Sequence, residues 1–152
     1  MRIVFSATDS RKKRKSGVPT GHAGEYLVIG ELLRRGYAAQ LADRNTPGYD
    51  LLVGRAGGLS MRTVQVKTVR QQPWFVRISD FDDIRCDQFT VNVLLGPEDA
   101  ANPVRFFVTK NRDLLGKFHH PEEWKAQGKD SGFMKLQDLT AFENKWESLV
   151  GP

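Results

Sequence analysis

The sequence predicts an α/β domain in which a mixed central β-sheet is flanked by helices. Two observations carry this prediction. Residues 22–35 place apolar side chains at helical spacing, and the stretches at 50–53, 60–68, 89–95 and 104–109 have the apolar, β-rich composition of strands. Strands interleaved with helices are typical of α/β domains. The 152 residues match one ordinary domain and are long enough to bury a core.

The first helix is expected from about His22 to Arg35. Pro19-Thr20-Gly21 is typical of a helix entry, with Thr20 as the cap, and Gly36 stops the helix. On this helix the apolar side chains share one sector, opposite Glu31, Arg34 and Arg35. The members of that sector are Tyr26, Val28, Ile29, Leu32 and Leu33.

The remaining elements follow from turn formers and apolar runs. Residues 43–48 form a turn-rich loop, and residues 54–58 make a hairpin turn between two strands. Further elements are a short strand at 37–41, a strand at 74–78, a short helix at 111–117, a helix from near Pro121, and helical or mixed structure over 136–149.

A basic arm is expected to precede the domain, with the arm over residues 1–19 and the domain over residues 20–152. Its charge is concentrated in one run: Arg11, Lys12, Lys13, Arg14 and Lys15. Such a run repels itself and is commonly a solvated tail. It is equally suited to contact phosphates and release counterions. The two interpretations are compatible.

Composition narrows the functional classes. The net charge of +5 favours polyanionic partners. No apolar run is long enough to span a bilayer, and the N-terminus lacks a secretory apolar segment, so we expect a cytoplasmic protein without a membrane partner. The single cysteine, Cys86, fits a reducing compartment, excludes a Cys-rich zinc site and is expected to be a small buried side chain.

Three positions carry polar groups where the pattern predicts apolar ones. Glu25 lies within the apolar sector of the helix, which is costly unless a metal, a cation or hydrogen bonds compensate it; alternatively it sits near solvent in the first turn. Gln65 and Lys67 share the strand face opposite Val64 and Val66, which suits either a site or a solvated sheet face.

Asp50 opens the strand that follows the Pro47-Gly48 loop. It is either part of the turn or a metal ligand that projects from the sheet. The hairpin holds its strand beside the strand of Gln65, so Asp50 can approach Gln65 in space. The order along the chain is therefore an acid in a helix, an acid at a strand start and Gln-Val-Lys on the paired strand.

This order resembles the PD-(D/E)XK nuclease superfamily. The helix, with Gly24-Glu25 and then Arg34-Arg35-Gly36-Tyr37, is similar to archaeal Holliday-junction resolvases. The Gln-x-Lys ending resembles Mrr-type endonucleases, which often carry Gln in place of the second acid. Residues 24–53 with 64–68 also resemble a group of small uncharacterised bacterial members. The resemblance covers about residues 20 to 70 and implies a restriction-endonuclease-like fold.

The resemblance implies a DNA endonuclease that uses Mg²⁺ or Mn²⁺. Asp50 would be the principal metal ligand, with the Gln65 amide oxygen and the Val66 carbonyl as further ligands and Glu25 acting through water or a second metal. Lys67 would orient the attacking water or stabilise the phosphate. Arg62 and Arg70 are candidates for a phosphate track.

Relatives often act as dimers because two cuts need two sites, which implies a homodimer. Gln65 is neutral where many relatives have an acid, so the site should hold its metal less tightly.

The sequence leaves two rival functions open. One is a nucleic-acid-binding module of the same fold that does not cut. The other is an accessory protein whose basic charge is incidental.

Overall fold

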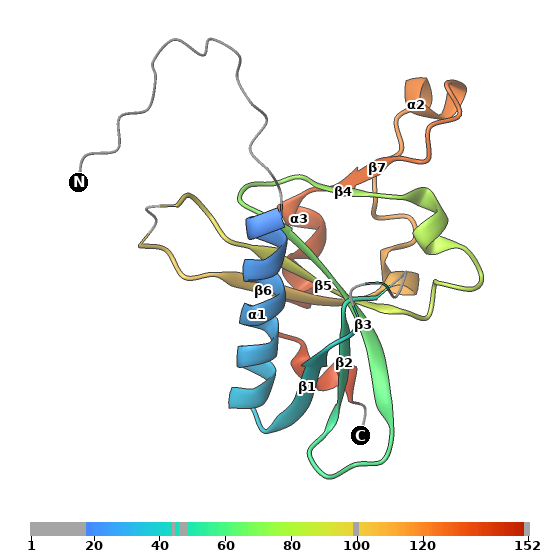
Figure 1. Cartoon of the computed structure of the whole chain (residues 1–152). Coiled ribbons are helices and arrows are strands. Elements are labelled where there is room, and N and C mark those ends of the chain that lie inside the picture. Colours follow the sequence, from blue (N-terminus) through green and yellow to red (C-terminus); the bar gives the residue numbers. More distant parts are fainter. Residues whose placement is uncertain (1–17, 44, 46–48, 99–100, 151–152) are drawn as a thin grey trace.

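The computed structural model describes residues 18–43, 45, 49–98 and 101–150. The basic run at 11–15 lies outside these residues, so its contact with phosphates stays a prediction. A five-stranded mixed sheet forms the centre of the fold, in the order β1-β2-β3-β5-β6 (Figure 1). Its strands are β1 (Tyr37–Leu41), β2 (Leu51–Arg55), β3 (Met61–Val69), β5 (Phe89–Leu94) and β6 (Arg105–Lys110).

Helix α1 (Val18–Arg34) begins four residues before the predicted start. Pro19 lies in its first turn, where its missing N–H costs nothing and its fixed φ suits a helix. Thr20 is therefore inside the helix and not at its cap, and Val18 and Pro19, the last residues of the predicted arm, belong to α1. The C-terminal stop at Gly36 is confirmed, since this residue takes a φ of 87°.

The buried stripe of α1 is narrower than predicted. Val28 and Leu32 are fully buried, whereas Tyr26 and Leu33 are 56% and 53% exposed. Gly24 lies so close to Thr68 of β3 that an added Cβ would overlap the threonine hydroxyl. Residues at a spacing of four lie on one helix face, so only this narrow stripe meets the sheet.

Strand pairing confirms the mixed sheet. β1, β2 and β3 form an antiparallel meander, β3 pairs with β5 in parallel, and β5 pairs with β6 antiparallel. The predicted hairpin turn joins β2 and β3, with Gly57 at a φ of 76°. β3 is the middle strand, so both of its edges are hydrogen-bonded and it is not an edge strand.

The two faces of the sheet differ in chemistry. One face is aliphatic and packs against α1, with Val64, Val91 and Val108 among its buried residues. The opposite face carries Gln65 and Lys67 on β3, and β5 places Thr90 and Asn92 beside them in register. Side chains alternate between faces along a strand, so the alternating sequence produces this contrast.

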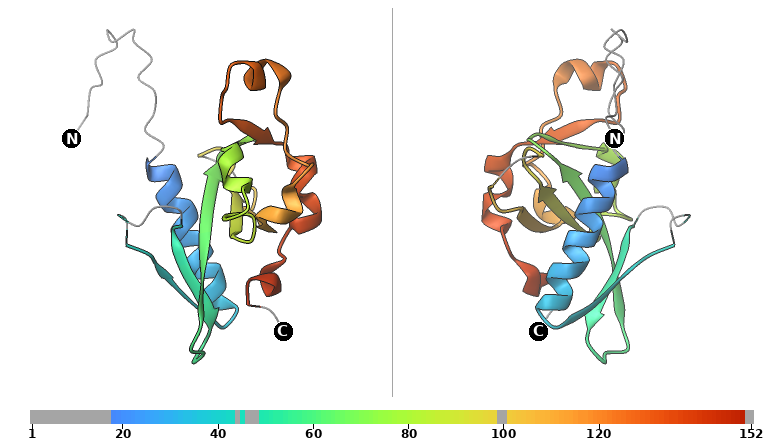
Figure 2. Two further views of the ribbon diagram at one scale, coloured as in Figure 1. Left: turned by 90° about the vertical axis from the view of Figure 1, so that its right-hand side faces the viewer. Right: turned by 60° about the vertical axis from the view of Figure 1, so that its left-hand side comes forward.

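Segments that follow β3 cover the polar face. Strand β4 (Trp74–Val76) pairs with β7 (Gly132–Met134) in a separate two-stranded sheet and not with the central sheet. Two 3-10 helices, η1 (Ile78–Phe81) and η2 (Asn111–Leu114), lie on the same side. Figure 2 shows α1 on one side of the central sheet and these segments on the other.

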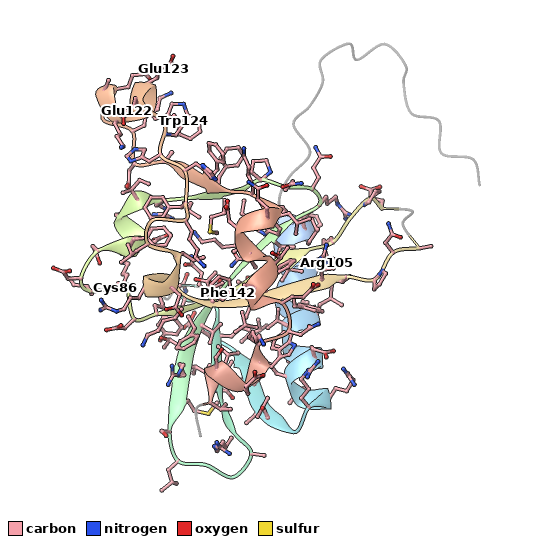
Figure 3. The ribbon with its side chains drawn as sticks, turned by 180° about the vertical axis from the view of Figure 1, so that it is seen from behind. Cys86, Arg105, Glu122, Glu123, Trp124 and Phe142 are labelled. Atoms are coloured by element: carbon pink, nitrogen blue, oxygen red, sulfur yellow. The ribbon has the colours of Figure 1, made fainter. Side chains whose placement is uncertain are left out.

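A second apolar cluster lies beneath this cover. Trp74 is fully buried there against Phe107, as expected for a core side chain, whereas Phe75 points outward and is 65% exposed. Cys86 is buried, as predicted. Helix α2 (Glu122–Ala126) begins after Pro121 as predicted and lies away from the central sheet (Figure 3). Its Glu122 and Glu123 are exposed, whereas Trp124 packs edge-on against Phe133 of β7.

The C-terminal region is mixed, as predicted, and consists of α3 (Leu136–Leu139), η3 (Thr140–Phe142) and η4 (Trp146–Leu149). Trp146 packs on Phe106 of the edge strand β6 and belongs to the cluster under α1. No helix among the described residues is long and apolar enough to cross a membrane.

Candidate active site

Asp50 lies where the β2–β3 ladder ends. Its backbone N–H donates to the Val64 carbonyl at 2.9 Å, and its Oδ2 accepts the Val66 N–H at 2.8 Å. The carboxylate thus takes the place of a backbone acceptor on the paired strand. The N–H and C=O of one strand residue point to the same side, so the Val66 carbonyl faces the edge where Asp50 sits.

Gln65 and Lys67 flank Val66 on the sheet face opposite α1. Both line a narrow recess, as expected from strand alternation. The floor and walls of the recess also include Asp80 of η1, Thr90 of β5 and Asn111 of η2. The structure therefore places Gln65 and Lys67 in one recess, and Asp50 lies just before β2 with its carboxylate bound to the N–H of Val66, the residue between them.

Glu25 occupies a different position. It is half-buried and lies in the second turn of α1, next to Gly24, which touches Thr68. Thr68 and Gln65 lie on opposite faces of β3, so the helix that carries Glu25 packs on the opposite face from Gln65 and Lys67. Its predicted role at a metal stays a prediction.

Lys67 forms a buried ion pair that the sequence analysis missed. Its Nζ lies 2.9 Å from Asp80 Oδ2, and the two side chains are 18% and 10% exposed. Arg85 donates from Nη1 to the other carboxylate oxygen at 3.2 Å. Buried charges are tolerated when paired in this way. The single carboxylate of Asp80 therefore serves two cations.

The buried polar residues gather around this pair. Among the described residues, those that are both polar and buried are Asp80, Thr90, Asn92, Thr109 and Asn111. Asn111 donates to the Asp80 and Arg85 carbonyls at 3.1 Å and accepts from the Thr90 hydroxyl at 2.9 Å. Asn92 Oδ1 is fully buried and finds no hydrogen-bond donor in the described part of the chain.

The 3-10 helix that carries Asp80 is also held from outside. The hydroxyl and the backbone N–H of Ser79 donate to the Asp130 carboxylate at 2.6 and 2.9 Å. These hydrogen bonds hold the pKa of Asp130 below its usual range, because they stabilise the ionised carboxylate. Asp130 comes from the segment before β7, so distant parts of the chain fix η1.

The two predicted phosphate-track arginines lie far apart. Arg62 lies near the start of β3 with its guanidinium over the Phe89 ring, 4.5 Å from the ring centroid. Arg70 follows the end of β3 and donates to the Gly96 carbonyl at 3.2 Å. At the rise of an extended strand the two Cα atoms are about 26 Å apart. Phe89 belongs to the apolar cluster under α1, so Arg62 lies on the face of β3 opposite to Gln65 and Lys67.

The adjacent residues His119 and His120 belong to no metal-binding cluster in the described part of the chain. His119 Nε2 lies 3.0 Å from Asp138 Oδ2, and its ring stacks on Phe133. Among residues 18–43, 45, 49–98 and 101–150, no group of three or more His, Cys, Asp or Glu side chains could hold a metal ion.

The donors around Asp50 have the chemistry of a hard-cation site of low charge. Asp50 offers a carboxylate, Gln65 an amide oxygen and Val66 a backbone carbonyl, and Mg²⁺ and Mn²⁺ prefer oxygen ligands. Mg²⁺ commonly binds through one or two carboxylates and keeps several waters. The donor types therefore fit such an ion, although the acid count is below that of a closed cage.

A solved structure is similar to this chain over most of its length. The chain is similar to Hjc, a Holliday junction resolvase from the archaeal hyperthermophile Archaeoglobus fulgidus, with a TM-score of 0.54 and 13% identity. The match covers 87% of this chain and 98% of the resolvase. The chain has a restriction-endonuclease-like fold. This is the fold of PD-(D/E)XK nucleases, and the predicted architecture is confirmed. No protein-family model and no curated protein matches the sequence.

One signal in the sequence could have revealed the missed residues. Residues 89–93 alternate strictly, with apolar side chains at 89, 91 and 93 and polar ones at 90 and 92. The same face of β3 carries Gln65 and Lys67, so alignment of the two strands would have predicted a polar patch. The partner of Lys67 has no such signal, because Asp80 reaches the patch only through the path of η1.

Proposed function

We propose that this protein is a metal-dependent endonuclease that hydrolyses DNA phosphodiester bonds in the cytoplasm, in repair, recombination or defence. The observation that carries the proposal is the Asp50 carboxylate bound to the N–H of Val66, between Gln65 and Lys67 on a restriction-endonuclease-like sheet. The similarity to a Holliday junction resolvase supports a nuclease role in general.

In this proposal Asp50, Gln65 and the Val66 carbonyl hold Mg²⁺ or Mn²⁺, with Glu25 acting through water. Such an ion neutralises phosphate charge and lowers the pKa of a bound water. Lys67 supplies a fixed positive charge at the phosphate and orients the attacking water. Asp50 keeps its carboxylate at the strand edge through its bond to Val66.

The basic residues would bind the DNA backbone. Arg62, Arg70 and the run Arg11, Lys12, Lys13, Arg14 and Lys15 would neutralise phosphates and make binding weaken with added salt. A homodimer would place two sites on one DNA molecule, so that both strands are cut. Analytical ultracentrifugation with and without DNA measures that state.

A second candidate function is a DNA-binding module that does not cut. It is favoured by the ion pair of Lys67 with Asp80, by the neutral Gln65 and by the absence of an acidic cluster among the described residues. In this case Lys67 serves the packing of the polar face and Asp50 serves only the end of the β2–β3 ladder.

One experiment separates the two functions. Purified protein is incubated with supercoiled, linear and branched DNA, with Mg²⁺, with Mn²⁺ and with a chelator. The nuclease proposal predicts cleavage products that require the metal and disappear with the chelator. DNA binding that is salt-sensitive, with intact DNA under every condition, identifies the binding module.

Two variants test the assignment of residues. Asp50→Ala and Lys67→Ala are each expected to abolish cleavage, a loss of at least about 10²-fold, because each removes a group that acts on the phosphate or its metal. Circular dichroism should show that both variants remain folded. Equal cleavage by the wild type and both variants would refute the site.

A further inference from the structure

The polar recess contains a carboxylate whose position is unusually constrained. Asp80 is 7% exposed, and both of its carboxylate oxygens are occupied by cations, Oδ2 by Lys67 and Oδ1 by Arg85. Its backbone carbonyl accepts a hydrogen bond from Asn111. The neighbouring Ser79 is held by Asp130. Asp80 is therefore fixed through its side chain, its main chain and its neighbour in sequence.

Lys67, in contrast, is a flexible side chain that needs a fixed partner. A lysine has many rotamers and presents a point charge with no planar geometry of its own. Strand β3 fixes only its Cα and Cβ. An immobile carboxylate 2.9 Å from Nζ selects one position of the ammonium group. Catalytic groups depend on partners of this kind, because their own rotamers must be locked.

Arg85 makes the net charge of the Lys67–Asp80 cluster positive. A carboxylate bound to a single lysine would neutralise it, so that the pair would present no net charge to a phosphate. Lys67, Arg85 and Asp80 together carry one net positive charge, and Arg85 is 43% exposed at the side chain. The cluster thus keeps Lys67 in place and still attracts an anion.

We propose that Asp80 is a positioning residue that holds the Lys67 ammonium for phosphodiester cleavage, with Arg85 restoring the positive charge of the pair. This inference rests on the proposed nuclease function. It assigns a role to η1, which lies outside the part of the sequence that resembles the nuclease superfamily. Asp80 acts through Lys67 and does not itself contact the DNA.

The first test observes Lys67 directly and needs no cleavage. A buried, ion-paired ammonium exchanges its protons slowly and gives a signal in a ¹H–¹⁵N spectrum tuned to lysine NH₃⁺ groups. The wild type should show one such signal that vanishes in Lys67→Met. Asp80→Asn should lose this signal, while Asp83→Asn, an exposed acid of the same loop, should retain it. A wild type without a Lys67 signal overturns the proposal.

The second test measures turnover on the DNA that the wild type cuts. Asp80→Asn should lower kcat about 10²-fold, the loss expected when a catalytic group is displaced by about an ångström, while KM and DNA affinity stay within twofold. Asp80→Glu should recover part of kcat because it restores the carboxylate. Asp83→Asn should match the wild type. Unchanged kcat in Asp80→Asn overturns the proposal.

The two tests fail separately. If the wild type cuts no DNA, the nuclease function fails, and the ammonium spectrum still decides whether Asp80 fixes Lys67. If the wild type cuts DNA but Asp80→Asn keeps both signal and kcat, only the role of Asp80 fails. If Asp80→Asn does not fold, the wild-type spectrum and Asp80→Glu decide the question. An Asp80→Glu variant that folds and loses the signal, yet cuts DNA at the wild-type rate, overturns it.

Discussion

The two faces of the central sheet are built from the same strands but carry different kinds of side chain. The face under α1 is filled by aliphatic side chains such as Val64 and Val91, both fully buried. The opposite face holds the buried polar residues around Lys67. Burial of polar groups costs free energy unless hydrogen bonds compensate it, so a fold selected for stability alone would fill both faces with apolar side chains. The polar face therefore depends on the hydrogen bonds and the ion pair around Asp80, whereas the apolar face needs none.

This comparison predicts that polarity is tolerated on one face only. Val91→Asn places an amide among aliphatic side chains on the α1 face and is expected to lower the free energy of unfolding by about 3 kcal/mol or more, because the amide finds no partner there. Urea unfolding measures the loss. A change below about 1 kcal/mol would show that the two faces are not distinct.

The matched control is the reverse change on the neighbouring residue. Asn92→Leu removes a buried amide whose Oδ1 meets no donor among the residues that the structure describes and whose Nδ2 makes a long contact of 3.4 Å to Thr109. Stability should stay within about 1 kcal/mol of the wild type, because an unsatisfied group is replaced by an apolar one of similar size. A large loss of stability would mean that Asn92 has a structural partner.

A smaller effect is expected at the contact of α1 with the apolar face. Gly24→Ala should lower the free energy of unfolding by about 1–3 kcal/mol, since the new Cβ overlaps the Thr68 hydroxyl and the helix must move. Gly30→Ala in the same helix meets nothing within 4 Å and should raise stability by about 0.5–1 kcal/mol. Thermal unfolding of both variants checks the opposite signs.

The smallest effect concerns the ion pair between Arg105 on the edge strand β6 and Glu143. Arg105 donates to Glu143 through two nitrogens, at 2.8 and 2.9 Å, and holds the pKa of Glu143 below its usual range. The stabilisation is therefore complete above the ordinary pKa of a glutamate and is lost as the pH falls through the lowered value.

Glu143→Gln should accordingly cost about 0.5 kcal/mol at neutral pH, because the side chains are 37% and 31% exposed and water screens them. The difference from the wild type should shrink in acid. Urea unfolding at several pH values measures it. A cost that stays constant into strong acid would show that the charge of Glu143 is not what stabilises the edge.

The order of elements and the apolar face could be predicted from local pattern. The helix, the β2–β3 hairpin and the strands at 89–95 and 104–109 all carry signals that span only a few residues. The sequence predictions fail where tertiary packing sets which side chains are buried and which strands pair. Tyr26 and Leu33 fit the helical apolar pattern but lie beside the narrow stripe that meets the sheet. The strand predicted at 74–78 is confirmed for residues 74–76, but Ile78 begins η1 and the strand pairs with β7.

The sequence by itself determined the alternation that sets Gln65 and Lys67 on one strand face and Asp50 at the start of the adjacent strand, because strand periodicity and hairpin geometry are local. Only the tertiary structure decided that Asp80 pairs with Lys67 and that Glu25 lies on a helix behind the strand. Those relations depend on how η1 and α1 pack on opposite faces of the sheet. No spacing in the chain encodes such packing, since it is set by the combined burial of residues far apart in sequence.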